Sequence, residues 1–196
     1  GVGVGLSVLT VFTLGGAVGL QVLHSSYVSG CYRGVYDADS PIDNLAECER
    51  QGLGYRYGAR AFQLLSIPVG ALGGHFLGRG AANRDMVAGL GPRSLGAIAG
   101  PGGALLGLGV LSLLITRGVM LTDWFKNRCA HEGFETCANK NQLVIDGSAD
   151  LSYAAITFGA LMLTYAAGYK RERGLASALT PSVGRGYAGL SLTGRF

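Results

Sequence analysis

Residues 1–23 read GVGVGLSVLTVFTLGGAVGLQVL and contain no charged side chain. A helix rises about 1.5 Å per residue, so a segment of this length can cross the hydrocarbon core of a bilayer, which is about 30 Å thick. The uninterrupted apolar character predicts a membrane-spanning helix at this position, and it sets the frame in which the rest of the sequence is interpreted.

Three further apolar segments follow, at about 55–77, 95–121 and 151–169. The 196 residues are 48% hydrophobic and only 14% charged, which is far from the composition of an ordinary soluble domain. Pro68 lies inside the second segment and would kink a membrane helix without ending it. The sequence therefore predicts an all-α membrane protein, a bundle of four transmembrane helices.

Glycine is unusually abundant, with 34 residues that lie mostly inside the apolar segments. In lipid, small residues let helix backbones approach closely and gain van der Waals contact. The third segment is the richest in glycine, and four of its glycines form small-xxx-small pairs. We expect these to be helix-packing positions: Gly96, Gly100, Gly103 and Gly107.

The chain can be divided into two units with one plan, an apolar helix, a loop with two cysteines, a second apolar helix and a basic turn. An offset of 96 residues pairs Tyr57 with Tyr153 and Phe62 with Phe158. Such units would be two parallel two-helix repeats related by an axis along the membrane normal. The expected boundaries are 1–94 and 95–174 for the two helix-loop-helix units, and 175–196 for a C-terminal tail.

All four cysteines lie outside the apolar segments, in the loops predicted at 25–54 and 123–149. This distribution favours disulfides in an oxidising compartment over free thiols or a metal site. Four cysteines allow three pairings. Proximity favours pairing within each loop, although the sequence leaves the choice open among Cys31, Cys48, Cys129 and Cys137.

Charge gives a second indication of sidedness. The two cysteine loops carry five basic and nine acidic residues. The remaining loop and the tail carry eight basic residues against Asp85 and Glu172. Basic loops face the cytoplasm in inner-membrane proteins, so we expect the cysteine loops to face outward.

Charged or titratable groups at membrane depth are functional candidates by default. Four deserve mention: Arg60, His75, Arg117 and Asp150. Snorkelling to the membrane surface explains both arginines, headgroup contact explains the histidine, and Asp150 is expected to begin the fourth helix. A metal at His24 and His131 would need Glu132 or Glu135 as well, and no spacing favours it.

The last stretch, SALTPSVGRGYAGLSLTGRF, differs from the rest because Leu190, Leu192 and Phe196 alternate as in a strand. It resembles the terminal strand of bacterial outer-membrane β-barrels, which commonly ends in phenylalanine. A single strand cannot close a barrel, so a short β-like tail that is flexible or paired with a partner is the favoured interpretation.

With its apolar helices, cysteine loops and terminal GRF, the chain resembles glycine-rich multi-pass bacterial envelope proteins of unknown function. Its topology is similar to that of tetraspanins, but their CCG signature is absent, so the resemblance carries no tetraspanin function.

These features favour a structural or scaffolding membrane protein that self-assembles or packs as a subunit of a larger complex in a cell membrane or bacterial envelope. No HExxH, GxSxG or phosphate-loop motif occurs, so we expect neither an enzyme nor a bound cofactor. The expected partners are the lipid bilayer and other membrane subunits, not nucleic acid, since no basic patch with interleaved aromatics appears.

Two other functions stay open. The first is an oligomeric channel or transporter, for which four hydroxyl residues could form a thin polar stripe: Ser66, Ser112, Thr116 and Thr157. The second is an accessory subunit of a membrane redox enzyme, but a haem between helices normally needs facing histidines, and only His75 lies within a segment.

Overall fold

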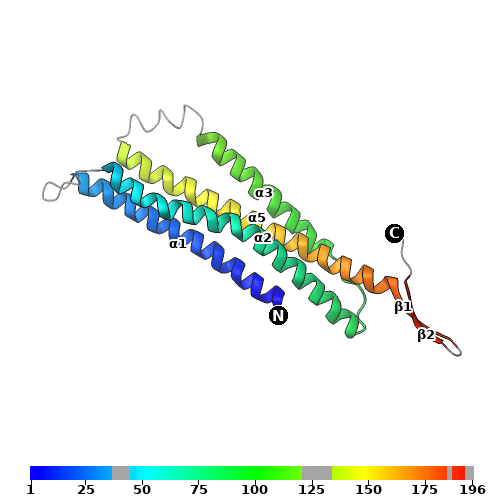
Figure 1. Cartoon of the computed structure of the whole chain (residues 1–196). Coiled ribbons are helices and arrows are strands. Elements are labelled where there is room, and N and C mark those ends of the chain that lie inside the picture. The colour runs from blue at the N-terminus through cyan, green and yellow to red at the C-terminus, as the bar shows by residue number, and fades with distance from the viewer. Residues whose placement is uncertain (37–44, 121–133, 185–186, 193–196) are drawn as a thin grey trace.

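The computed structural model describes residues 1–36, 45–120, 134–184 and 187–192. Four helices account for nearly all of these residues, and two short strands follow them (Figure 1). The helices are α1 (Val2–Tyr36), α2 (Leu45–Val87), α3 (Gly96–Met120) and α5 (Phe134–Ala178).

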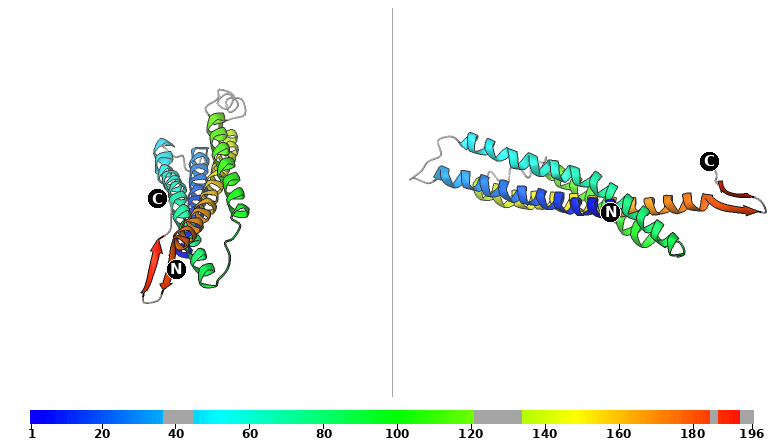
Figure 2. Two further views of the ribbon diagram at one scale, coloured as in Figure 1. Left: turned by 90° about the vertical axis from the view of Figure 1, so that its right-hand side faces the viewer. Right: turned by 60° about the horizontal axis from the view of Figure 1, so that its bottom comes forward.

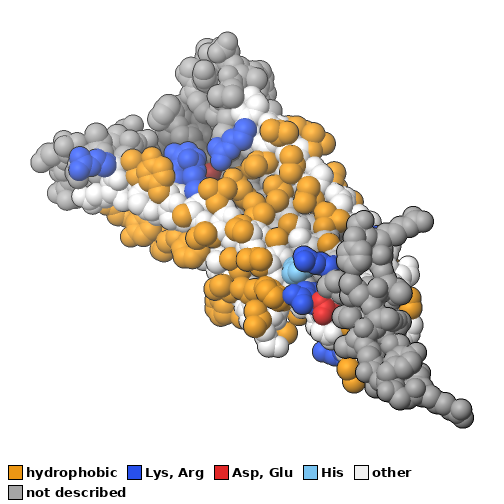
Figure 3. Space-filling model, turned by 45° about the vertical axis from the view of Figure 1, so that its right-hand side comes forward, with side chains coloured by type: hydrophobic (Ala, Val, Ile, Leu, Met, Phe, Trp, Pro, Cys, Tyr) orange, Lys and Arg blue, Asp and Glu red, His pale blue; other side chains and the backbone are white. Residues whose placement is uncertain are grey.

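Each helix contains a stretch long and apolar enough to cross a membrane, so the prediction of four such helices is confirmed. The stretches are Val2–Tyr27, Arg50–Val87, Gly96–Gly118 and Asp146–Gly174. Large apolar side chains are exposed along them, including Phe12 at 72% and Leu114 at 65%. Figure 3 shows hydrophobic side chains over the middle of one face, with basic side chains gathered toward its two ends. A surface of this kind suits contact with lipid.

The helices follow one another in space in the order α1, α2, α5, α3, so that α2 and α5 are central (Figures 1 and 2). α2 and α5 run in the same direction, because Gln63 contacts Asp150 at one end and Asp85 contacts Tyr169 at the other. The two expected helix pairs, α1 with α2 and α3 with α5, therefore meet through their second helices. The hydrogen bonds between α2 and α5 join residues that are 84 to 93 positions apart in the sequence. These separations are close to the offset of 96 residues that aligns the two units but do not equal it. The duplication therefore stays a prediction.

Glycines bring the central helices into backbone contact. A Cβ atom added at Gly74 would lie 2.1 Å from the carbonyl oxygen of Leu161, and one at Gly78 would lie 2.1 Å from that of Tyr165. α3 meets α5 in the same way, since a Cβ at Gly109 would lie 2.8 Å from the carbonyl oxygen of Ser152. Without side chains at these positions, the helices pack closely enough to gain contact energy that lipid does not supply.

The expected packing glycines of α3 lie on another face. A Cβ at Gly100, Gly103 or Gly107 would meet no atom within 4 Å, and one at Gly96 would reach only the Ser94 hydroxyl, 4.0 Å away. These four glycines thus make no close contact between helices within the described part of one chain, and their role in packing stays a prediction.

The helices are longer than the apolar segments, and the predicted loop boundaries 25–54 and 123–149 are wrong. α1 continues to Tyr36, α2 already begins at Leu45, and α5 begins at Phe134. Hydropathy identifies only the part of a helix that suits lipid, whereas segments such as LAECER, which opens α2, are built from good helix formers that remain helical in water.

The tail contains two strands in the described residues, β1 (Leu179–Gly184) and β2 (Tyr187–Leu192). They pair antiparallel, with Leu179 opposite Leu192 and Gly184 opposite Tyr187, and lie beyond the end of α5 (Figure 2). Leu190 and Leu192 fall in β2, and Phe196 lies outside the described residues. The expected boundary of the tail at residue 175 falls within α5, which ends at Ala178.

Candidate functional site at the ends of α2 and α5

Hydroxyl and amide groups join the central helices at membrane depth. The hydroxyls of Ser66 and Thr157 lie 2.9 Å apart, and both residues are fully buried. Closer to the N-terminal ends of both helices, the buried Gln63 amide of α2 donates to the Asp150 carboxylate of α5. In lipid, such bonds between helices satisfy groups that would otherwise lack a partner.

Hydroxyls also join α3 to α5. The Ser152 hydroxyl donates to that of Ser112 over 2.9 Å, and the hydroxyls of Thr116 and Ser148 lie 3.4 Å apart. With Ser66 and Thr157, all four hydroxyl residues considered for a pore stripe are therefore hydrogen-bonded between helices.

The most highly connected polar cluster lies where α2 ends. The amide of Gly89 donates to the Met86 carbonyl over 3.1 Å, and that of Leu90 donates to the Asp85 carbonyl over 2.8 Å. This is the Schellman pattern, in which the residue after the helix adopts a left-handed conformation, here Gly89 with φ of 65°. The turn reverses the chain and sends residues 90–95 back along the helix end.

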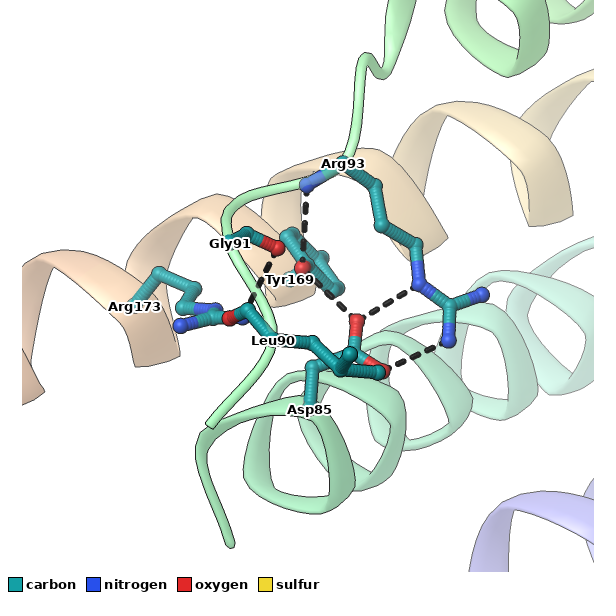
Figure 4. Close-up of polar contacts among 6 residues, drawn as sticks. All are labelled: Asp85, Leu90, Gly91, Arg93, Tyr169 and Arg173. Carbon is teal, nitrogen blue, oxygen red and sulfur yellow. Dashed lines mark hydrogen bonds and ion pairs between the residues drawn. The ribbon is translucent and has the colours of Figure 1, made fainter. Parts of the chain in front are cut away.

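The reversal brings Arg93 onto Asp85 (Figure 4). The guanidinium binds the carboxylate with two bonds, Nε to Oδ2 at 2.5 Å and Nη2 to Oδ1 at 2.6 Å. From α5, the Tyr169 hydroxyl donates to the same Oδ2 over 2.9 Å and accepts the backbone N–H of Arg93 over 3.2 Å. Asp85 and Tyr169 are each only 1% exposed, so the loop and α5 together cover the carboxylate.

The charges in this cluster compensate one another. An acidic side chain in the last turn of a helix is repelled by the negative end of the helix dipole, so Asp85 needs a cation and donors nearby. In return, the hydrogen bonds to Asp85 hold the pKa of Arg93 above its ordinary value, so this guanidinium stays charged at any physiological pH.

Arg173 fastens the loop from the side of α5. Its Nη2 donates to the carbonyl oxygens of Leu90 over 2.6 Å and Gly91 over 3.2 Å (Figure 4). Its guanidinium carbon lies 5.7 Å from the centre of the Tyr169 ring, within the range of a cation–π contact. The Nε atom of Arg173 is buried and has no hydrogen-bond partner among the described residues.

A cavity of about 850 Å³ adjoins this cluster. Its lining combines basic side chains, Arg93, Lys170 and Arg173, with the apolar side chains of Met86 and Leu95. Ligand sites in proteins commonly have volumes of a few hundred to about 1,000 Å³, mostly apolar walls and a few polar groups. This cavity is therefore the candidate functional site.

The polar residues singled out in the sequence lie elsewhere. Arg60 interacts with the charges of Arg56, Arg117 and Asp146, near the opposite end of the spanning stretches. The expectation that Asp150 begins the fourth helix is wrong, because α5 begins at Phe134. Its carboxylate instead contacts Gln63 across the central interface, a partnership that depends on how the helices pack.

The two histidines that the structure describes lie against neighbouring helices. A Cβ at Gly168 would lie 2.4 Å from the carbonyl oxygen of His75, whose ring meets that of Phe76 edge-on. His24 is only 4% exposed, with Nδ1 3.0 Å from the Gly52 carbonyl oxygen. His131, Glu132 and Glu135 have no described side chains, and the described residues contain no group of three or more potential metal ligands.

Among the cysteines, the structure describes the side chain of Cys31 alone, which is buried and 1% exposed. The side chains of Cys48, Cys129 and Cys137 lie outside the described residues, so disulfide pairing stays a prediction.

In the sequence, Asp85, Arg93 and Arg173 enter only as charges of a loop and the tail, and Tyr169 is not among the candidate residues. One feature of the sequence does point to Asp85. Asp85 follows Arg79 and Arg84 near a helix end, where a basic residue is favourable and an acidic one is not, so it needed a partner.

Searches against protein-family models, curated proteins and solved structures find no match to this chain. The resemblance to glycine-rich envelope proteins therefore stays a prediction.

Proposed function

We propose that this chain is a structural subunit of a membrane assembly, which packs through its outer helix faces against copies of itself or against other membrane subunits. The observation that supports this proposal best is the outer face of α3. α3 packs extensively only against α5, so most of its circumference has no protein neighbour in the described part of the chain.

The glycines of that outer face favour a protein partner over lipid. Gly100, Gly103 and Gly107 recur at helical spacing, and an added Cβ at any of them would meet no atom. An exposed leucine needs no explanation in a bilayer, because lipid tails are as apolar as leucine. A run of exposed glycines gains nothing from lipid but lets another helix approach closely.

A second open glycine face lies on α1, at the other edge of the row of helices. Gly15 and Gly19 are four residues apart, and a Cβ at either would meet no atom within 4 Å. Two small-residue faces on opposite edges suit head-to-tail contact, with α1 of one copy against α3 of the next. Such heterologous contacts generate closed rings or open filaments.

The scaffold is favoured over the alternative of an oligomeric channel or transporter. A wet pore needs polar groups that line it, and the hydroxyls available are bonded to neighbouring helices. A location in a cell membrane or bacterial envelope, with disulfide-stapled loops on an oxidising side, belongs to the same proposal and is supported by the charge asymmetry of the sequence.

The test is the mass of the native particle in mild detergent, with every chain in it identified and the measurement repeated after reduction. We expect a particle of several subunits that loses mass in the double variant Gly100→Leu and Gly107→Leu. Gly80→Leu in α2 is the matched control, because a Cβ there also meets no atom but the position lies outside both glycine faces. A lone monomer of 20.2 kDa, or equal effects of the variant and its control, would refute the proposal.

A further inference from the structure

The cavity beside Arg93 and Arg173 lies at the depth where membrane-spanning stretches end. The stretch in α2 ends at Val87, that in α3 begins at Gly96, and that in α5 ends at Gly174. The cavity is lined from all three neighbourhoods, by Met86 of α2, by Leu95 just before α3, and by residues of α5, namely Tyr169, Lys170, Arg173 and Gly174. Its walls therefore lie where lipid headgroups meet acyl chains.

The charge of the lining is positive. Arg93, Lys170 and Arg173 contribute three cations, and Asp85 behind Arg93 offsets one of them. The nearby carboxylate of Glu172 is already engaged, since it accepts from Arg79 Nε over 2.6 Å and from Asn83 Nδ2 over 3.5 Å. An excess of positive charge therefore remains beside the cavity.

Donors are also left over. Arg173 uses Nη2 on two carbonyl oxygens of the loop, while its buried Nε has no partner among the described residues. Arg93 uses Nε and Nη2 on Asp85, which leaves its other terminal nitrogen. A guanidinium with donors left over can bind a further anionic oxygen through charge-assisted hydrogen bonds.

We propose that this cavity binds a phospholipid with an anionic headgroup. The phosphate lies against Arg173 and Lys170, and an acyl chain runs along Met86 and Leu95. The phosphate belongs to a lipid because a free inorganic anion has no apolar part that could contact the apolar side chains of the lining. Basic pockets between membrane helices are also suited to anionic headgroups. This inference does not depend on the assembly proposed above.

The test is a titration of the detergent-solubilised protein with phosphatidylglycerol, counting bound lipids by native mass spectrometry. Phosphatidylcholine serves as the zwitterionic comparison and inorganic phosphate as the soluble anion. We expect Lys170→Gln to weaken phosphatidylglycerol binding about fivefold, and Lys170→Gln with Arg173→Gln to weaken it further. Arg171→Gln is the matched control, since it removes the same charge from an exposed neighbour that does not line the cavity.

The outcomes are distinct. Loss of lipid binding in Lys170→Gln but not in Arg171→Gln supports the site, and Lys170→Gln remains informative if Arg173→Gln fails to fold. Equal losses in the two single variants overturn it in favour of diffuse surface charge. Equal affinity for phosphatidylcholine also overturns it, because the site would then not depend on the charge of the headgroup. Full displacement of the lipid by millimolar inorganic phosphate overturns it as well, because the site would then be one for a soluble anion.

Discussion

The close contact of α2 with α5 makes a sharp prediction about Gly74 and Gly78. Replacing either glycine with alanine adds a single methyl group that faces a backbone carbonyl of α5, that of Leu161 or Tyr165. A backbone oxygen in a helix cannot rotate aside as the end of a flexible side chain can. The two helices must therefore separate or shift if the methyl group is to fit.

The size of the effect follows from the geometry. Each added Cβ would lie 2.1 Å from its oxygen, about 1.3 Å short of the 3.4 Å at which ordinary contact begins. A radial gap of about 0.5–1 Å already forfeits a quarter to a half of the dispersion energy of an atom pair. We expect each substitution to lower the free energy of unfolding by about 1–3 kcal/mol, the usual cost of overpacking, and the double variant to lose more.

Unfolding by sodium dodecyl sulfate titration in mixed micelles, followed by circular dichroism, measures the effect. Gly80→Ala is the control in the same helix, because a Cβ there meets no atom within 4 Å. It should be neutral or stabilising by up to about 1 kcal/mol, as expected when alanine replaces glycine in a helix. If Gly74→Ala and Gly78→Ala behave like this control, the close approach of α2 and α5 is wrong.

Three further substitutions probe the polar contacts. Tyr169→Phe removes a buried hydroxyl bonded to Asp85 and should lower stability by about 1–3 kcal/mol in the same unfolding assay, whereas no loss would show that this hydroxyl does not hold the loop. Gly89→Ala places a side chain at φ 65° and should lower the free energy of unfolding by about 1–2 kcal/mol. Gly91→Ala is the control, because a Cβ there meets no atom within 4 Å and the residue has no positive φ. Equal effects of the two substitutions would contradict the Schellman turn. Ser66→Ala breaks the bond to Thr157 and should cost only about 0.6 kcal/mol, the average for such bonds in membranes, so that a loss above about 2 kcal/mol would contradict a simple packing role.

The sequence was most informative about the number of membrane-spanning helices. Hydropathy depends on composition along the chain, and residues 1–23 and 95–121 are apolar enough to identify a span without any partner. It was less informative about where the helices end, because α1 and α5 continue into polar sequence that is helical for reasons other than lipid contact.

The roles of individual glycines could not be derived in this way. Every apolar segment carries glycines at small-xxx-small spacing, and spacing alone fixes neither the face that meets a neighbour nor the depth at which it does. The sequence pointed to Gly100 and Gly107, whereas close contact with α5 within the chain is made at Gly102 and Gly109. A difference of two residues turns a position by about 200° around a helix, so the two sets lie on nearly opposite faces.

The sequence by itself determined that the chain has four segments long and apolar enough to cross a membrane as helices, since the transfer of apolar side chains into lipid is a property of each segment taken alone. Only the tertiary structure decided that Asp85, Arg93 and Tyr169 form one cluster, and that Arg173 and Lys170 line a cavity beside it. Those residues lie up to 88 positions apart along the chain. Their meeting depends on the Schellman turn at Gly89 and on the register of α2 against α5, which are set by contacts between segments.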